Sequence, residues 1–100
     1  MSSMEHLNQI KEVVAETLRA DFHNVKILRV DVDQDVDADG DDVLLISVVF
    51  EGRPKDLDAS KLSGAVRNVR PKLRDIGEAA FPLFSFVSRR DAGLGKFETA

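Results

Sequence analysis

The stretch VLLISVVF, residues 43–50, constrains the fold more than any other part of this sequence. Seven of its eight residues are apolar, and four of them are β-branched. Such a run has no polar face, which is typical of a strand in the middle of a sheet. The sequence therefore predicts a central β-strand here, and the rest of the chain must supply the elements that cover it.

The stretch before it, VKILRVDVD at residues 25–33, alternates between apolar and charged side chains. A period of two is typical of a strand with one face on the core and the other in water. The apolar side is expected to hold Leu28, Val30 and Val32, and the wet side Arg29, Asp31 and Asp33. A short acidic segment separates the two strands, so we expect a long antiparallel hairpin.

The tip of this hairpin, DVDADGDD at residues 35–42, resembles the first half of an EF-hand calcium loop in the spacing of its aspartates and its glycine. The resemblance stops there, because Ile46 stands where that loop has its bidentate glutamate and Asp42 where it has an apolar residue. The flanking elements are also predicted to be strands, whereas an EF-hand has helices. We therefore expect a solvated turn and no metal ligands.

Two amphipathic helices are predicted. The first covers residues 4–20, where Ser2 and Glu5 fit a capping box. The second begins near Asp58 and ends near Gly77. Its apolar stripe consists of Leu62, Ala65, Val66, Val69, Leu73 and Ile76. Pro71 interrupts this stripe, so the segment forms either one kinked helix or two short helices with Pro71 opening the second.

A third strand is expected at FPLFSFVS, residues 81–88, with Pro82 near its start. The predicted fold is α+β: a two-layer sandwich of order α-β-β-α(α)-β, in which the helices cover one face of a three-stranded sheet. Residues 1–90 form one domain, and residues 91–100 form a loose tail. The phenylalanines of the strands, Phe50, Phe81, Phe84 and Phe86, are expected to pack in the core.

The composition indicates the cellular compartment in which the chain is expected to function. The chain has 100 residues and no cysteine, tryptophan or tyrosine, so disulfides and thiolate metal sites are excluded. No apolar run approaches the roughly 18 residues of a membrane span, and the first residues lack the basic-then-apolar order of a secretion signal. We therefore expect a cytoplasmic protein that does not enter the membrane.

Catalytic patterns are missing from the sequence. The two histidines, His6 and His23, stand alone, and neither begins a metal-ligand pattern or lies beside a nucleophile in sequence. The glycines form no phosphate-binding loop, and no DNA-binding motif is present. We therefore predict a protein that is not an enzyme and that binds no cofactor.

Charge is unevenly distributed along the chain. Residues 1–50 carry 11 acidic and 4 basic residues, whereas residues 51–100 carry 7 acidic and 10 basic ones. On the second helix, Arg67, Arg70 and Arg74 share one side, and Lys55 and Lys61 precede them. These five residues are the candidate binding site, because arginines bind phosphates or carboxylates through paired hydrogen bonds. The alternative is an ordinary solvated helix side whose arginines pair with Asp75 and Glu78.

The stretch LSGAVRNVRPKLRDIGEAAFPLFSFV, residues 62–87, resembles the ribosome-binding factor A family of type II KH-like proteins. That family has a short Ala-x-Gly element between two helices, followed by apolar residues and a basic one. Residues 62–64 and Arg67 occupy these places, and Pro82 opens the last strand as in the family. Leu62 departs from the family's alanine. The resemblance implies a KH-like topology and an RNA-binding role in ribosome assembly.

Two functions follow. The first is a small interaction module that binds a protein partner, as an adaptor, a subunit or the neutralising half of a two-component pair. The second is a KH-like RNA-binding domain that uses the five basic residues. The net charge of −4 favours the first, because phosphates repel an acidic chain. The sequence leaves the partner and the oligomeric state open.

Overall fold

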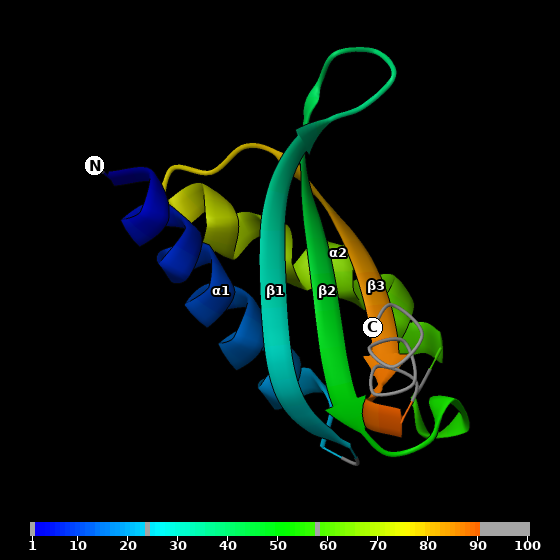
Figure 1. The fold of residues 1–100 in the computed structure, drawn as a ribbon. Helices are drawn as coiled ribbons and strands as arrows, with labels where there is room; N and C mark the ends of the chain where they lie inside the picture. Colours follow the sequence, from blue (N-terminus) through cyan, green and yellow to red (C-terminus); the bar gives the residue numbers. More distant parts are fainter. Residues whose placement is uncertain (1, 24, 58, 91–100) are drawn as a thin grey trace, which may run out of the picture.

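The computed structural model describes residues 2–23, 25–57 and 59–90. Its elements are α1 (Ser2–Asp21), β1 (Lys26–Val36), β2 (Asp42–Glu51), the short 3-10 helix η1 (Pro54–Asp56), α2 (Ala59–Asp75) and β3 (Phe81–Ser88). They form the predicted α-β-β-α-β order in two layers, a three-stranded sheet and a pair of helices (Figure 1). Asp58 and the predicted tail at 91–100 lie outside the described residues. Neither described helix is long and apolar enough to cross a membrane.

The strand order is β1-β2-β3, so the predicted central strand is confirmed. β1 and β2 are antiparallel, from the pair Lys26–Glu51 to the pair Val36–Asp42, as the hairpin prediction requires. β3 is parallel to β2 and pairs with it from Val43–Phe81 to Phe50–Ser88. Parallel neighbouring strands need a crossover connection, and α2 is part of the crossover that connects β2 to β3.

Both helices lie on the same face of the sheet, behind the strands in Figure 1. They bury side chains at helical spacing: Ile10, Val14 and Leu18 from α1, and Ala65, Val69 and Leu73 from α2. Every second residue of β2 meets them, namely Leu44, Ile46, Val48 and Phe50. These residues and their neighbours form the hydrophobic core, and neither of the two described helices covers the other face of the sheet.

The end of α2 follows the predicted signal. Gly77 has a φ of +82°, a conformation that glycine adopts without a steric penalty. Its N–H donates to the Arg74 carbonyl at 3.0 Å, and the N–H of Glu78 donates to the Leu73 carbonyl at 2.8 Å. Pro71 lies inside α2, so the structure has one helix here and not two.

Two predicted core positions are wrong. A β-bulge between Ile27 and Arg29 shifts the register of β1, so Leu28 leaves the core side and is 37% exposed. Phe81 is 40% exposed because it pairs with Val43 on the face that the helices leave open. Phe22, which lies between the helix predicted at residues 4–20 and the strand predicted at residues 25–33, is buried, with its ring centroid 5.7 Å from that of Phe86.

Candidate interaction surfaces

The three arginines of the predicted site do share one side of α2, as their spacing requires. Arg67 and Arg74 are exposed, and within the described residues no carboxylate lies within ion-pair distance of either. Arg70 is half-buried, and its guanidinium carbon lies 5.1 Å from the centroid of the Phe81 ring. This cation–π contact holds Arg70 against the outer edge of β3.

The two lysines do not extend this side of the helix. Lys61 donates from Nζ to the backbone carbonyl of Asp21 at 2.7 Å, and therefore fastens α2 to the end of α1. Lys55 is exposed in η1, before the first turn of α2, whereas Arg74 is in the last turn. At about 1.5 Å per residue, the 17-residue helix separates these ends by roughly 25 Å. The five basic residues therefore do not form one surface.

The short element at residues 62–64, which was compared with the Ala-x-Gly element of the ribosome-binding factor A family, has a helical conformation. Residues 62–64 lie within α2, and the Ser63 hydroxyl donates to the Ala59 carbonyl at 3.1 Å in the turn before it. Among the described residues, no loop interrupts the helix at this point. The backbone N–H groups of these residues are thus engaged in the helix and do not form a phosphate-binding turn.

The acidic hairpin tip is a self-contained turn. One oxygen of Asp37, Oδ1, accepts hydrogen bonds from the N–H groups of Asp39 and Asp41, both at 2.9 Å. Gly40 has a φ of +86°, as the turn requires. The carboxylates of Asp37, Asp39 and Asp41 come within 4.8 Å of one another, and all three residues are exposed. These hydrogen bonds engage the Asp37 carboxylate with the backbone N–H groups of Asp39 and Asp41, so Asp37 stabilises the turn.

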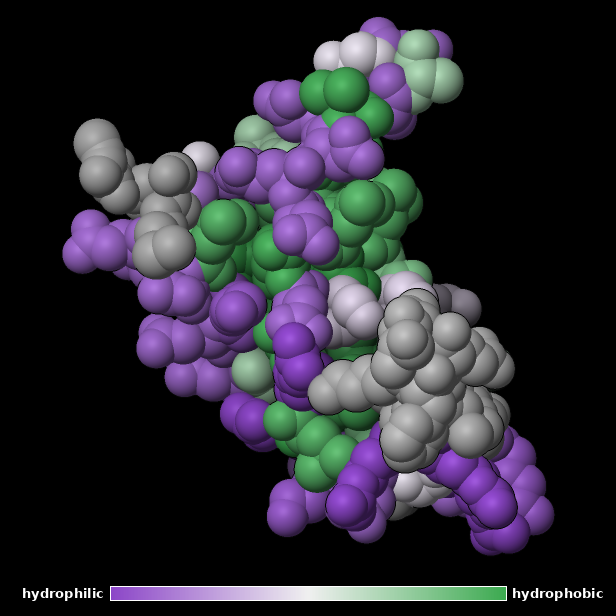
Figure 2. Space-filling model, viewed as in Figure 1, coloured by the Kyte–Doolittle hydropathy of each residue, from purple (hydrophilic) through white to green (hydrophobic). Residues whose placement is uncertain are grey.

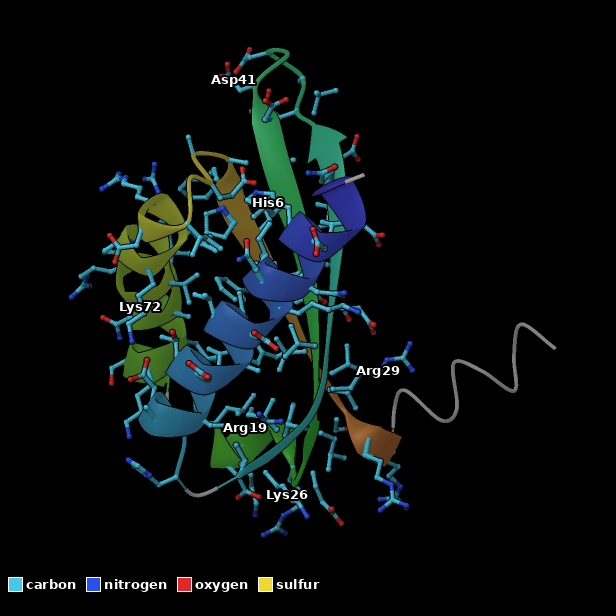
Figure 3. The ribbon with its side chains drawn as sticks, turned by 90° about the vertical axis from the view of Figure 1, so that its left-hand side faces the viewer. His6, Arg19, Lys26, Arg29, Asp41 and Lys72 are labelled. Atoms are coloured by element: carbon cyan, nitrogen blue, oxygen red, sulfur yellow. The ribbon has the colours of Figure 1, made fainter. Side chains whose placement is uncertain are left out.

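His6 has a partner that its position in the sequence did not reveal. Its Nε2 lies 2.8 Å from Oε1 of Glu78, whose Oε2 accepts the N–H of Ala80 at 2.9 Å. His6 thus fastens the first turns of α1 to the connection between α2 and β3 (Figure 3). Within the described residues, the hydrogen bonds of this pair involve no hydroxyl group that could act as a nucleophile.

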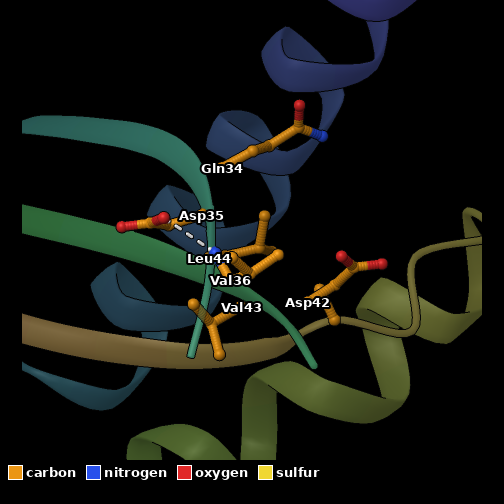
Figure 4. A pocket seen from close by; sticks show the side chains of 7 residues that line it. Gln34, Asp35, Val36, Asp42, Val43 and Leu44 are labelled. Carbon is orange, nitrogen blue, oxygen red and sulfur yellow. Dashed lines mark hydrogen bonds between the residues drawn. The ribbon is translucent and has the colours of Figure 1, made fainter. Parts of the chain in front are cut away.

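A pocket of about 420 Å³ lies at the tip end of the sheet (Figure 4). It is lined by Gln34, Asp35, Val36, Asp42, Val43, Leu44 and Ala80. This lining offers carboxylates and an amide, but no histidine, lysine, hydroxyl or thiol. The pocket therefore lacks the Ser-His or Cys-His pairing of nucleophile and base that many hydrolases use.

The open face of the sheet carries large apolar side chains. Residues that pair across strands share a face, so the residues of β2 that alternate with the core residues lie here with their partners. At the end near the hairpin tip, four apolar residues adjoin and form what we call the open-face patch: Val43, Leu45, Phe81 and Leu83. Leu45 and Phe81 are each 40% exposed and Leu83 44%, whereas Val43 is buried, with 6% of its surface exposed. Figure 2 shows hydrophobic residues gathered on this half of the face.

Charged residues border the open-face patch. Asp33 and Asp35 of β1 pair with Leu45 and Val43, so they lie on the same face along one edge. Arg70 lies at the opposite edge, over Phe81. Farther from the tip the face changes character: Ser47 and Ser85 pair in its middle, followed by Arg29 at the β1 edge (Figure 3).

Sequence reasoning missed this patch because it assigned both sides of VLLISVVF to the core. The signal was nevertheless present, since helices on one face of a sheet cover only alternate residues of a strand. Comparisons with protein-family models, with curated protein sequences and with solved structures found no match. Functional inference therefore rests on the surface itself.

Proposed function

We propose that this chain is a cytoplasmic, non-enzymatic interaction domain that binds a protein partner through the open face of its sheet. The observation that carries the proposal is the open-face patch. Leu45, Phe81 and Leu83 adjoin on two neighbouring strands, and each leaves about two-fifths of its surface in water. Contiguous exposed apolar side chains rimmed by charges are typical of protein-binding surfaces.

The energetic gain from covering the patch is considerable. Complete burial of a leucine or phenylalanine side chain contributes about 1.5–3 kcal/mol. Burial of the exposed two-fifths of three such side chains therefore contributes roughly 2–4 kcal/mol in total. The strands do not need apolar residues at positions 45 and 83. Serine there would maintain the strand without placing apolar surface in water, as Ser47 and Ser85 show farther along the same two strands.

The charge distribution supports a protein partner over RNA. The open face carries Asp33 and Asp35 along one edge, where phosphates would be repelled. The exposed arginines of α2, Arg67 and Arg74, lie in the helical layer and not on this face. Neither the patch nor its border offers the aromatic pair and basic groove on which single-stranded RNA stacks.

The test is affinity capture from lysate with wild-type bait and with a bait carrying Leu45→Asp and Leu83→Asp. A matched control carries Leu28→Asp and Val36→Asp, which replace exposed apolar residues elsewhere with the same change in charge. We expect a protein that binds the wild type and the control in the presence of nuclease, and that is lost from the patch variant. Equal capture by all three baits, or capture that nuclease abolishes, would contradict the proposal.

A further inference from the structure

We propose that the partner covering the open-face patch is a second copy of this chain, packed face to face about a two-fold axis that runs parallel to the strands over β2. This inference rests on the proposed function and names the occupant of the same surface. Three features of the open face carry it: which charges are already paired, where the unpaired charges lie, and how large the face is.

Two ion pairs lie far from the hairpin tip. Arg29 Nε lies 2.8 Å from a carboxylate oxygen of Asp31, its neighbour on the same side of β1. Arg89, just after β3, lies 3.5 Å from a carboxylate oxygen of Glu51 at the end of β2. The apolar residues that pair on this half of the open face, Val49 and Val87, are smaller than the leucines and the phenylalanine of the open-face patch.

Three charged residues without a counterion lie beside the open-face patch. Within the described residues, Asp33 and Asp35 have no cationic partner, and Arg70 has no anionic one. Asp35 is level with Val43, which is in turn level with Phe81, the residue under Arg70. Acid and base thus stand at opposite edges of the sheet but at the same height along the strands.

A two-fold axis parallel to the strands exchanges the edges of the sheet and preserves height. It places β1 of one copy over β3 of the other, so Asp35 of each copy approaches Arg70 of its partner. The same operation stacks patch on patch, with Leu45 near the axis. The contact is isologous, and every favourable pair occurs twice.

An axis perpendicular to the strands gives a worse fit. It keeps each strand over its own counterpart but reverses height about the level of Ser47 and Ser85. Leu45 and Leu83 would then lie over the smaller Val49 and Val87, and Arg70 would approach the Arg89 end of β3 instead of an acidic residue. The first axis is therefore the one that gives Arg70 an acidic partner and stacks the large apolar residues on one another.

The size of the face indicates a weak dimer. Three strands at a spacing of about 4.8 Å and a length of ten residues at about 3.3 Å each give roughly 450 Å² of flat area. Two such faces bury on the order of 1,000 Å², at the lower limit of specific interfaces. We expect self-association in the micromolar range, so the measurement must extend to high concentration.

The test uses two reciprocal charge reversals, Asp35→Arg and Arg70→Asp. In each variant alone, both symmetric contacts become repulsive. When the two variants are mixed, the arginine introduced into one faces the aspartate introduced into the other, and the native Arg70 faces the native Asp35, so both contacts are attractive again. Sedimentation equilibrium from about 10 to about 500 µM gives the dissociation constants, and native mass spectrometry identifies the mixed species.

We expect the wild type to dimerise, each reversal to raise the dissociation constant at least about tenfold, and the equimolar mixture to restore a dimer composed of one copy of each. Asp39→Arg at the hairpin tip and Arg67→Asp on α2 are matched controls that should behave as the wild type. Circular dichroism verifies that all variants are folded. A monomeric wild type, reversals that match their controls, or a mixture that stays monomeric would each overturn the proposal. If another protein is still lost from the Leu45→Asp/Leu83→Asp bait, the proposed function stands without the dimer.

Discussion

Leu44 and Leu45 are neighbours in β2 whose side chains point to opposite faces of the sheet, and their replacement by alanine tests the arrangement of the whole fold. Leu44 is completely buried under the helices, whereas Leu45 is 40% exposed on the open face. The two substitutions delete the same atoms from the same strand. Any difference between the stability losses that the two substitutions cause therefore reflects the different surroundings of the two faces of the sheet.

The expected losses in the free energy of unfolding for Leu44→Ala and Leu45→Ala differ by a factor of about two to three. Leucine to alanine removes three carbons, which at about 0.8 kcal/mol per buried group amounts to roughly 2.4 kcal/mol at a fully buried site. The cavity left at Leu44 raises its cost to about 3–5 kcal/mol. At Leu45 only about three-fifths of the transfer contribution applies and water fills the space, which leaves roughly 1.5 kcal/mol.

The free energy of unfolding is measured by urea titration with far-ultraviolet circular dichroism, since the chain has no tryptophan or tyrosine for fluorescence. With a slope near 1.5 kcal/mol per molar, the midpoint should fall by about 2–3 M for Leu44→Ala and by about 1 M for Leu45→Ala. A low protein concentration keeps self-association out of the measurement. Equal losses at the two sites would refute the assignment of one covered and one open face.

Three further results are expected. Pro71→Ala should stabilise the protein by about 1–2 kcal/mol in the same titration, because the alanine N–H restores a hydrogen bond inside α2; a loss would contradict the continuous helix. Gly40→Ala should cost about 1 kcal/mol because φ is +86°, whereas Gly64→Ala, in helical backbone with open space, should be neutral or stabilising; equal effects would contradict the turn geometry. RNA affinity, if measurable, should keep its salt dependence when Arg67 and Arg74 become alanine; a slope reduced by about one unit per arginine would support RNA binding instead.

Local sequence patterns predicted the elements well. The period of two in residues 25–33 and the helical spacing in α1 and α2 gave the correct type and order of every major element. Gly77 marked the end of α2 because a positive φ is a local requirement. The pairing of β3 with β2, and its parallel direction, had no local signal, since it depends on where α2 crosses the sheet.

Of the candidate binding site, the sequence predicted correctly only the part whose geometry depends on a single helix. Arg67, Arg70 and Arg74 share a side because helical geometry alone places them there. The roles of Lys61 and His6 could not be predicted, because they depend on how α1 packs against α2 and against the segment that follows α2. This packing brings His6 next to Glu78, which is 72 residues away in the sequence, and Lys61 next to Asp21. The exposure of Phe81 likewise depended on knowing which face of the sheet the helices cover.

The feature that fixed the fold also carries its proposed function. VLLISVVF is apolar on both sides, yet both described helices lie on one side, so three of its seven hydrophobic residues have no described helix over them. If the open face only met water, polar residues would be expected along its whole length, as Ser47 and Ser85 are in the middle. Instead Leu45, Phe81 and Leu83 gather at one end, beside the charges that have no partner within the described chain. A surface whose most exposed apolar side chains lie beside charges without a partner among the described residues has the composition of an interface whose other half is a separate molecule.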